Sequence, residues 1–356
     1  MSARSDDETL RYSSQARLPE LGAEGQEKLR RARVLCVGAG GLGAPVLLYL
    51  ASAGVGRIGI IDPDTVSLSN LQRQVIYRTS DCGRLKAEVA REQLLALNPF
   101  IDISIYPTAL GPRNALTILN AYNLIIDGTD NFATKFLLND ACARLSKPLI
   151  YASVTGFEGQ VASFSGSHGP CFRCLYPQPP VAAIPNCAEA GVLGAMVGVV
   201  GSLQALQAVQ CILRGYAVPE TKLSFFDGRT HQLSNFRLAQ RADCAVCSQP
   251  KDQIRLTSGV EAQTDDVLWL DVRSPDEWQS GHIAQALNWP VQELERGNFP
   301  ELQKSRAIRV YCATGLRSQR AAARLKAAGF ERVDALELGL RQWTGALVTD
   351  TSARPR

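Results

Sequence analysis

The stretch that decides the fold is Val34-Leu35-Cys36-Val37-Gly38-Ala39-Gly40-Gly41-Leu42-Gly43. Its first four residues are apolar and a helical pattern follows at 44–53, so it predicts a strand, a tight glycine turn and a helix N-terminus. Such a turn holds bare backbone amides against phosphate oxygens. We therefore expect the glycines of this turn to bind the phosphates of a nucleotide.

Strands and helices alternate around this turn. The patterns predict strands at 34–37, 58–61, 101–106 and 124–127, and helices at 44–53, 84–97, 113–120 and 131–145. This alternation is typical of βαβ units and a parallel sheet. Short strands are expected next at 149–154, 159–165, 222–227 and 231–238, around an apolar helix at 191–213. The sequence predicts an α/β fold with a Rossmann-like, mostly parallel sheet and a mixed or antiparallel extension, preceded by a polar helical arm at 1–30.

Two further motifs favour ATP over a dinucleotide. Asp62 follows the second strand, where a carboxylate can hold ribose hydroxyls, and this alone also fits an NAD-dependent oxidoreductase. Arg73 and Lys86 follow it, and Asp130 lies just past the fourth strand. Two cations neutralise phosphate charge and one acid holds Mg²⁺, as a triphosphate requires. The NAD alternative would leave both cations without a purpose.

Composition limits the class of protein. The 356 residues are 46% hydrophobic and 20% charged with a net charge of +4, which is typical of globular proteins, and the length favours two domains. Basic residues are scattered, without the cationic stripe that nucleic-acid binding needs. The N-terminus is polar and acidic, and the apolar stretch 191–213 contains Gln204, Gln207 and Gln210, which favours a core helix. We expect a cytoplasmic enzyme that binds neither nucleic acid nor membrane.

Four of the ten cysteines form two C-x-x-C pairs, Cys171 with Cys174 and Cys244 with Cys247. This spacing lets two thiolates from one turn occupy adjacent corners of a tetrahedron, so the pairs predict a four-cysteine zinc site. Four thiolates leave no position for water, which makes the zinc structural. Two redox C-x-x-C motifs are the less favoured alternative. Three cysteines in apolar surroundings are expected in the core, namely Cys36, Cys142 and Cys211.

A second α/β pattern starts after a polar linker at 249–253. It predicts a domain at 254–350, following a first domain at 1–248. Cys312 follows the strand at 308–311 and precedes a helix at 318–328. Backbone amides, the helix N-terminus and Arg317 would favour its thiolate, which could carry a persulfide sulfur. A buried strand-end cysteine is the alternative.

Roughly residues 8 to 248 resemble the MoeB/ThiF family, prokaryotic relatives of ubiquitin-activating enzymes. The resemblance rests on the glycine turn, the segment 66–74, the segment 83–86, Asp127 to Asn131 and the segment 188–192. It implies that Asp62 binds ribose, that Arg73 and Lys86 bind phosphates and that Asp130 binds Mg²⁺. The residues expected to bind ATP are Gly38, Gly40, Gly41, Gly43, Asp62, Asp64, Ser69, Asn70, Arg73, Gln74, Lys86, Thr129, Asp130 and Asn131.

The second pattern resembles a single rhodanese domain, on the segments 270–278, 281–283 and 286–288 and on the Cys312 loop. Four residues separate Cys312 from Arg317, which suits sulfur; related phosphatases carry one more. His282 is expected to be structural, because Gly281 and Ile283 suggest a packed turn.

Together the resemblances imply an adenylyltransferase and sulfurtransferase. It would activate the C-terminal glycine of a small ubiquitin-like sulfur carrier ending in Gly-Gly, then pass sulfur from a Cys312 persulfide to form a thiocarboxylate. A cysteine desulfurase or thiosulfate would supply the sulfur, and relatives imply a homodimer. Cys187 is a candidate for releasing the product by disulfide formation, or is an inert thiol. The carrier and its pathway (molybdopterin, thiamine, cysteine, thiolated tRNA or siderophore) stay open.

The N-terminal segment departs from the family pattern. The family has Arg-Tyr-x-Arg, whose second arginine reaches the partner subunit's ATP site, but Ser14 stands at that position after Arg11 and Tyr12. Either Arg11 or Arg17 substitutes, or adenylation is slow. A third possible function follows, beside the adenylyltransferase with sulfurtransferase activity and the NAD-dependent oxidoreductase. In it the first domain has lost its adenylation activity and only binds carriers for a working sulfurtransferase domain.

Overall fold

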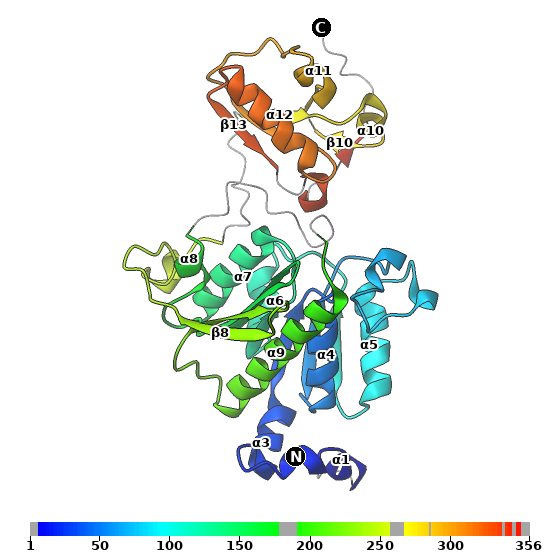
Figure 1. The fold of residues 1–356 in the computed structure, drawn as a ribbon, viewed down its shortest axis with the longest axis vertical. Helices are drawn as coiled ribbons and strands as arrows, with labels where there is room; N and C mark the ends of the chain where they lie inside the picture. Colours follow the sequence, from blue (N-terminus) through cyan, green and yellow to red (C-terminus); the bar gives the residue numbers. More distant parts are fainter. Residues whose placement is uncertain are drawn as a thin grey trace. The chain divides into compact units, whose positions relative to one another are not determined.

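The strand that leads into the glycine turn lies inside a large sheet (Figure 1). The computed structural model describes residues 6–177, 191–256, 267–284, 286–336, 339–343 and 347–349. These residues divide into two compact units, one holding the described chain up to Leu256 and the other the described chain from Val267. The exact domain boundaries stay a prediction.

The first unit contains an eight-stranded sheet in the order β3-β2-β1-β4-β5-β6-β7-β8. Its strands are β1 (Arg33–Val37), β2 (Arg57–Ile61), β3 (Asp102–Tyr106), β4 (Leu124–Asp127), β5 (Leu149–Thr155), β6 (Glu158–Phe164), β7 (Lys222–Asp227) and β8 (Gln232–Arg237). The strands from β3 to β5 pair in parallel, and β5 to β8 pair antiparallel. The predicted mostly parallel sheet with an antiparallel extension is confirmed.

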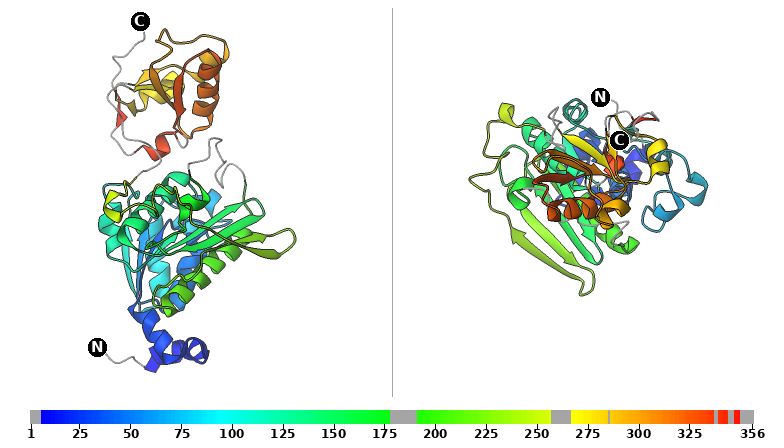
Figure 2. Two further views of the ribbon diagram at one scale, coloured as in Figure 1. Left: turned by 90° about the vertical axis from the view of Figure 1, so that its left-hand side faces the viewer. Right: turned by 90° about the horizontal axis from the view of Figure 1, so that it is seen from above.

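Helices cover both faces of this sheet (Figure 2). One apolar core joins the sheet to α4 (Gly43–Ser52), α5 (Lys86–Leu97) and α9 (Gly194–Leu213). A second core joins its other face to α6 (Ala115–Asn120), α7 (Phe132–Leu145) and the short α8 (Phe172–Leu175). Apolar side chains are buried on both faces of β1 and β4, which explains their continuous apolar runs.

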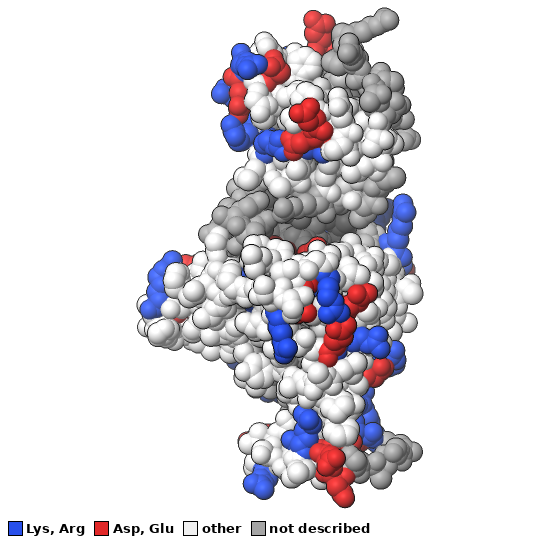
Figure 3. Space-filling view, turned by 90° about the vertical axis from the view of Figure 1, so that its right-hand side faces the viewer, with Lys and Arg blue, Asp and Glu red and all other residues white. Residues whose placement is uncertain are grey.

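The N-terminal arm and the connecting turns complete the first unit. The arm consists of α1 (Asp6–Arg11), α2 (Ser13–Ala16) and α3 (Gly22–Arg31), as its polar helical pattern predicts. Two single-turn helices, η1 (Leu68–Asn70) and η2 (Thr79–Asp81), lie between β2 and α5. On the face nearest α5, Lys and Arg are interspersed with Asp and Glu (Figure 3). Glu92 of α5 pairs with Arg84 at 2.6 Å.

The long apolar helix α9 is a core helix. By length and composition it could cross a membrane, but half of its most apolar window is buried inside the protein. It packs on α4, β5 and β6. The Gln204 amide is fully buried and donates to the carbonyl oxygens of Asp127 and Ile150 at 2.8 and 2.9 Å, so it joins α9 to β4 and β5.

A buried ion pair joins the end of β4 to α7. Lys135 Nζ lies 3.0 Å from Asp127 Oδ2, and both side chains are almost wholly inaccessible. The ammonium also donates to the carbonyl oxygens of Thr129 and Ala152 at 2.9 and 2.8 Å. Its three protons therefore meet three oxygens, so the buried charge is fully hydrogen-bonded.

The second unit is a smaller α/β domain. Its four-stranded parallel sheet has the order β11-β9-β12-β13, and β10 pairs separately with β14. The elements are β9 (Leu268–Asp271), α10 (Pro275–Gln279), β10 (His282–Ile283), β11 (Leu287–Asn288), α11 (Val291–Glu295), β12 (Ala307–Tyr311), α12 (Leu316–Ala327), β13 (Arg332–Ala335), η4 (Gly339–Gln342) and β14 (Leu347–Val348). Helix α12 begins two residues before the predicted start, directly after Gly315, so Arg317 lies in its first turn.

The expected linker is anchored to the first unit. It contains η3 (Lys251–Gln253), and Lys251 Nζ donates to Ser146 Oγ at 2.5 Å. The next residue, Ile254, is buried beside Cys171 and Cys244, and its carbonyl accepts from Arg144 at 3.2 Å. The chain therefore stays on the first unit through Ile254.

Replacing Lys135 by Met should destabilise the first unit. The change leaves the Asp127 carboxylate buried without its cation, which costs about 3–5 kcal/mol of unfolding free energy. All four tryptophans, Trp269, Trp278, Trp289 and Trp343, belong to the second unit. In a urea titration, the far-UV circular dichroism transition should move to lower urea while the tryptophan fluorescence transition stays.

The matched control is the double variant Asp127→Asn/Lys135→Met, which removes both charges. It should lose less stability than Lys135→Met alone, because no unpaired charge stays buried. Equal stability of Lys135→Met and the unchanged protein would contradict the role given to this pair.

Candidate functional site

The loops that follow β1 and β4 lie against each other at the carboxyl edge of the sheet. The chain winds outward through β2 and β3 on one side of β1 and through β4 and β5 on the other, so this is the switch point where open α/β sheets bind ligands. A Cβ on Gly38 would lie 2.7 Å from the carbonyl oxygen of Gly128, and one on Gly43 would lie 2.0 Å from that of Gly38. Neither position has room for a side chain, so the loops meet through glycine.

Asp62 joins the end of β2 to the glycine loop. Its Oδ2 accepts from the Ala39 amide at 2.8 Å, and its Oδ1 accepts from the Asp64 amide at 2.9 Å. Burial raises the pKa of Asp62, while the Lys86 charge and the two amides act in the opposite direction. The carboxylate predicted to bind ribose therefore lies directly beside the loop predicted to bind phosphate.

Two cations lie around this loop. Lys86 is buried at the first position of α5, and its Nζ pairs with exposed Asp64 at 2.9 Å. A Cβ on Gly41 would lie 3.5 Å from Arg73 Cδ, so Arg73 flanks the loop, and its guanidinium donates to the Ser69 carbonyl at 3.2 Å. Lys86 and Arg73 are thus brought to the glycine loop from separate segments.

Gln74 and Asn70 come from the same turn as Arg73. Gln74 is buried near Gly40, and its Oε1 has no hydrogen-bond partner among the described residues. Asn70 ends η1, and its carbonyl accepts from the Gln74 amide at 2.9 Å. Ser69 is exposed, with its hydroxyl 2.8 Å from that of Ser67.

In the loop after β4, one exposed carboxylate lies between two residues whose side chains make hydrogen bonds with nearby residues of the chain. Thr129 donates its amide and hydroxyl to Asp127 at 3.0 and 2.6 Å. Asn131 caps α7 by accepting from the Thr134 amide at 2.8 Å. Asp130 lies between them and is exposed. A carboxylate oxygen at this edge is the kind of ligand that Mg²⁺ takes, so Asp130 fits the predicted metal by its chemistry.

Two buried residues at this site escaped the sequence analysis. Tyr77 donates its hydroxyl to the Ala39 carbonyl at 2.8 Å and lies 3.3 Å from the Lys86 carbonyl, so it braces the glycine loop against α5. Lys135 holds the base of the β4 loop. No local pattern singled out either residue, because α7 contains other charged residues, Asp140 and Arg144, and Tyr77 lies in a loop.

Arg11 and Arg17, the two arginines that could replace the cation missing at Ser14, lie in the N-terminal arm and differ in their contacts. Arg11 donates to the Leu97 carbonyl at 3.0 Å and lies over the Phe100 ring. Ser14 is exposed on α2, and exposed Arg17 follows the helix as its C-terminal cap.

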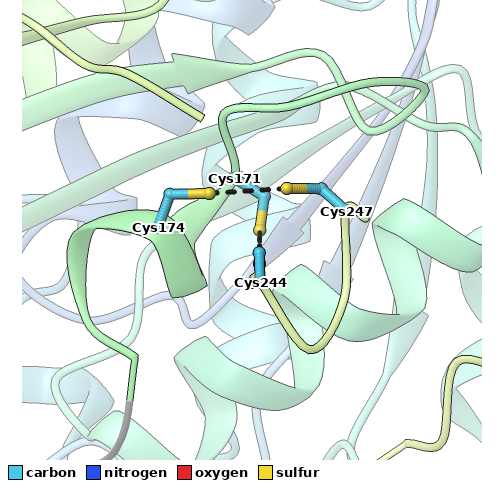
Figure 4. A group of neighbouring side chains, drawn as sticks. All are labelled: Cys171, Cys174, Cys244 and Cys247. Carbon is cyan, nitrogen blue, oxygen red and sulfur yellow. Dashed lines mark hydrogen bonds between the residues drawn. The ribbon is translucent and has the colours of Figure 1, made fainter. Parts of the chain in front are cut away.

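The four paired cysteines converge from two segments, the short helix α8 with its N-cap Cys171 and the turn that carries Cys244 and Cys247 (Figure 4). Their sulfur atoms all lie within 4.8 Å of one another, with Cys174–Cys247 at 3.4 Å and Cys171–Cys244 at 3.6 Å. A tetrahedron with Zn–S bonds of about 2.3 Å has sulfur atoms about 3.8 Å apart. The Arg241 amide also donates to Cys174 Sγ at 3.5 Å. The cluster therefore fits a zinc ion.

Cys312 lies in a cradle of hydrogen-bond donors at the start of α12. The Gly315 amide donates to its Sγ at 3.0 Å, and Ser318 Oγ lies 3.6 Å away. Burial raises the pKa of the Cys312 thiol, but hydrogen bonds from Ser318, Thr314 and Gly315 outweigh it and bring the pKa below its ordinary value. The direction agrees with the predicted thiolate.

Arg317 is paired with an acid that the sequence analysis did not single out. Its guanidinium donates to both carboxylate oxygens of Glu277, at 2.6 and 2.7 Å. These hydrogen bonds lower the pKa of Glu277 to about 2. His282 is buried and stacked on Trp278, which agrees with its predicted structural role.

The remaining cysteines divide by burial. Cys36, Cys142 and Cys211 are buried in the cores, as predicted, and burial raises the pKa of each thiol. Cys82 is exposed. Cys187 lies outside the described residues.

Both units match known families. Residues 12–246 match the ThiF family, and residues 258–346 match the rhodanese-like domain. Among solved structures, the chain resembles E. coli MccB bound to MccA-N7isoASN, with a TM-score of 0.58, 22% identity and coverage of 69% of this chain and 76% of that one. At that identity the likeness shows the fold.

Curated relatives match over most of the chain. The probable adenylyltransferase/sulfurtransferase MoeZ of Mycobacterium tuberculosis is 38% identical, covering 98% of this chain and 96% of that protein. The adenylyltransferase and sulfurtransferase MOCS3 of Culex quinquefasciatus is 46% identical, but the match covers 76% of this chain and 64% of that protein. The sulfur carrier protein adenylyltransferase of Thermus thermophilus is 46% identical over 70% of this chain and 94% of its own length. The chain therefore belongs to the ThiF family and carries a rhodanese-like domain as its second unit.

Proposed function

We propose that this protein adenylates the C-terminal glycine of a small ubiquitin-like sulfur carrier and then converts that carboxylate to a thiocarboxylate. The observation that carries the proposal is the meeting of the glycine loop with the β4 loop, with Asp62, Arg73 and Lys86 around them. The names of relatives as adenylyltransferases and sulfurtransferases support it.

In the first step the carrier carboxylate attacks the α-phosphorus of ATP, and pyrophosphate leaves with the bonding electrons. The amides of the glycine loop bind phosphate oxygens, and Asp62 binds the ribose hydroxyls. Lys86 and Arg73 neutralise the charge that develops on the phosphates. Lys86 would then exchange its partner Asp64 for a phosphate, which keeps its buried charge compensated throughout.

Mg²⁺ would be held by Asp130 and by phosphate oxygens, and when bound it supplies further charge neutralisation. Zinc in the four-cysteine cluster would be structural, because its four thiolates fill a tetrahedral shell.

In the second step sulfur is transferred through Cys312. A donor leaves one sulfur atom on the Cys312 thiolate as a persulfide, whose terminal sulfur attacks the acyl-adenylate carbonyl, and AMP leaves. The product is an acyl disulfide between carrier and Cys312. Attack by a second thiolate on the Cys312 sulfur would release the thiocarboxylate and form a disulfide. Cys187 is our candidate for that thiolate, and an external thiol would then reduce the disulfide.

The partners follow from this chemistry. The carrier ends in Gly-Gly, and a cysteine desulfurase or thiosulfate supplies the sulfur. We also propose a cytoplasmic homodimer. Exposed apolar side chains on the neighbouring helices α4 and α9, namely Tyr49, Val199 and Leu206, would be covered by a second copy. Arg17, exposed at the end of α2, is the candidate to replace the cation missing at Ser14.

One alternative is favoured by Ser14 itself, namely that the first unit docks carriers without adenylating them. The second unit would then work as a sulfurtransferase alone.

Pyrophosphate exchange distinguishes the two functions. The full chain with MgATP and each small Gly-Gly-ending protein of the host should exchange labelled pyrophosphate into ATP with the correct carrier. Lys86→Met and Asp130→Asn should each lower the rate by about 10²–10³-fold, the usual effect of removing one charge-stabilising group. Cys312→Ser should leave exchange intact and abolish replacement of one carrier oxygen by sulfur, read by intact mass. Absence of exchange with every carrier, alongside turnover of thiosulfate, would instead support docking.

Loss of the metal should destabilise the first unit. Cys244→Ser should reduce zinc, measured by elemental mass spectrometry, from about one ion per chain, since a four-thiolate site needs all of its ligands. The far-UV circular dichroism transition should move to lower temperature. Cys82→Ser is the matched control, because this exposed cysteine lies outside the cluster. Equal zinc content in the two variants would refute the site.

Removal of the Ser318 hydroxyl should raise the pKa of Cys312. Ser318→Ala deletes a hydrogen bond that favours the thiolate, so the alkylation rate of Cys312 by iodoacetamide should rise at a higher pH than in the unchanged protein. Thr314→Ala is the control, because Thr314 contributes through its backbone amide, which this change keeps. Peptide mass spectrometry reads Cys312 alone. Identical pH profiles for Ser318→Ala and Thr314→Ala would rule out the hydroxyl.

A further inference from the structure

Arg317, which follows the Cys312 loop, is paired with the carboxylate of Glu277. Arg317 and Glu277 form a two-pronged ion pair with N···O distances of 2.6 and 2.7 Å, between the first turns of α12 and α10. The side chains are only 30% and 36% exposed. Arg317 lies five positions after Cys312, in the first turn of the helix that follows the Cys312 loop. The hydrogen bond to Glu277 raises the pKa of Arg317.

The neighbouring arginine is neutralised in the same way. Arg273 is buried, and its guanidinium contacts both carboxylate oxygens of Asp271 at 2.6 to 3.0 Å and the Gly281 carbonyl at 2.7 Å. Each of these two arginines therefore stands opposite one carboxylate. The described groups that contact Cys312 Sγ are neutral, namely the Gly315 amide at 3.0 Å and the Ser318 hydroxyl at 3.6 Å, which also donates to the Gly315 carbonyl at 2.7 Å.

Sulfur donors differ in the charge that they bring to this cradle. Thiosulfate carries two negative charges: the Cys312 thiolate attacks its outer sulfur, the S–S bond breaks, and sulfite leaves with the electron pair and two charges. Three negative charges therefore gather in that transition state. An ionised persulfide brings one charge and releases a thiolate with one charge, so two gather. An uncompensated cation at the cradle would favour thiosulfate, because the attraction grows with the charge of the donor.

We propose that Glu277 determines donor specificity: by neutralising Arg317 it makes the Cys312 site favour a singly charged persulfide over dianionic thiosulfate. The proposal rests on the sulfurtransferase function given above. Glu277 acts through Arg317 and is a positioning residue, which does not itself contact the donor.

The structure offers a variant that removes the charge and keeps the fold. Glu277 also completes the capping box of α10, where its Oε2 accepts from the amide and hydroxyl of Ser274, both at 3.1 Å. Glutamine keeps an oxygen acceptor at this position of a capping box. Glu277→Gln therefore removes the negative charge and keeps the hydrogen-bond acceptor of the helix cap. Ser274→Ala is the converse control, since it weakens the cap and leaves both charges in place.

The test measures how fast Cys312 gains one sulfur atom in the full chain, read by quenched intact mass under excess donor, with Cys312→Ser as the blank. The donors are thiosulfate and the persulfide of 2-mercaptoethanol, whose charge lies on sulfur alone. Glu277→Gln should raise the rate constant with thiosulfate about tenfold relative to that with the persulfide, the effect of one partly screened charge contact. The gain should shrink as salt is added.

Two further variants show whether the gain passes through Arg317. In Glu277→Gln/Arg317→Gln the ratio of the two rate constants should return to that of the unchanged protein, because the uncompensated cation is gone. Ser274→Ala should leave the ratio unchanged. If Glu277→Gln changes both rate constants by the same factor, or neither, the specificity role is refuted while the sulfurtransferase function stands. If the unchanged protein accepts sulfur from neither donor, the proposed function itself fails.

Discussion

A buried ammonium beneath the end of β4 fixes the carboxyl edge of the large sheet, where we propose that the nucleotide binds. Lys135 connects Asp127 of β4, the Thr129 carbonyl of the next loop and the Ala152 carbonyl of β5. Because a buried charge is tolerated only with its partners in place, the geometry of the loop becomes part of the fold. The same loop passes Gly128 against Gly38 and presents Asp130. The position of Asp130, the proposed Mg²⁺ ligand, therefore depends on a buried ion pair.

Charge compensation recurs at each site. Lys86 is paired with Asp64, Arg273 with Asp271, and Arg317 with Glu277. A cation that must meet phosphate or a sulfur anion is costly to keep desolvated alone, so an acidic neighbour stabilises it before the ligand arrives. At the proposed nucleotide site Asp64 is exposed, so it could release Lys86 to a phosphate. At the proposed sulfur site Glu277 also completes the cap of α10, which favours a lasting pair with Arg317, and our proposal assigns the donor selectivity to that pair.

The parts that could be predicted from sequence have local causes. The apolar runs of β1 and β4 are continuous because both faces of the parallel sheet are covered, and the glycines at 38 and 43 are required by contacts shorter than any side chain allows. The cysteine cluster could be predicted because the spacing within each C-x-x-C pair is visible in the sequence. Tyr77, Lys135 and Glu277 could not be found this way, since their roles come from partners 8 to 40 positions away. Nor does any local pattern show that Arg317 is already paired.

Ile254 packs against the cysteine cluster, so the proposed zinc site bears on where the chain leaves the first unit. The chain leaves the first unit only after this residue, whose side chain lies beside Cys171 and Cys244 and whose carbonyl is held by Arg144. An intact cluster therefore helps to keep the chain through Ile254 on the first unit. On our proposal that zinc fills the cluster and that the two units act in sequence, a metal outside both chemical steps would raise the effective concentration of one site at the other, because that concentration falls as a connecting segment lengthens beyond the span it must bridge.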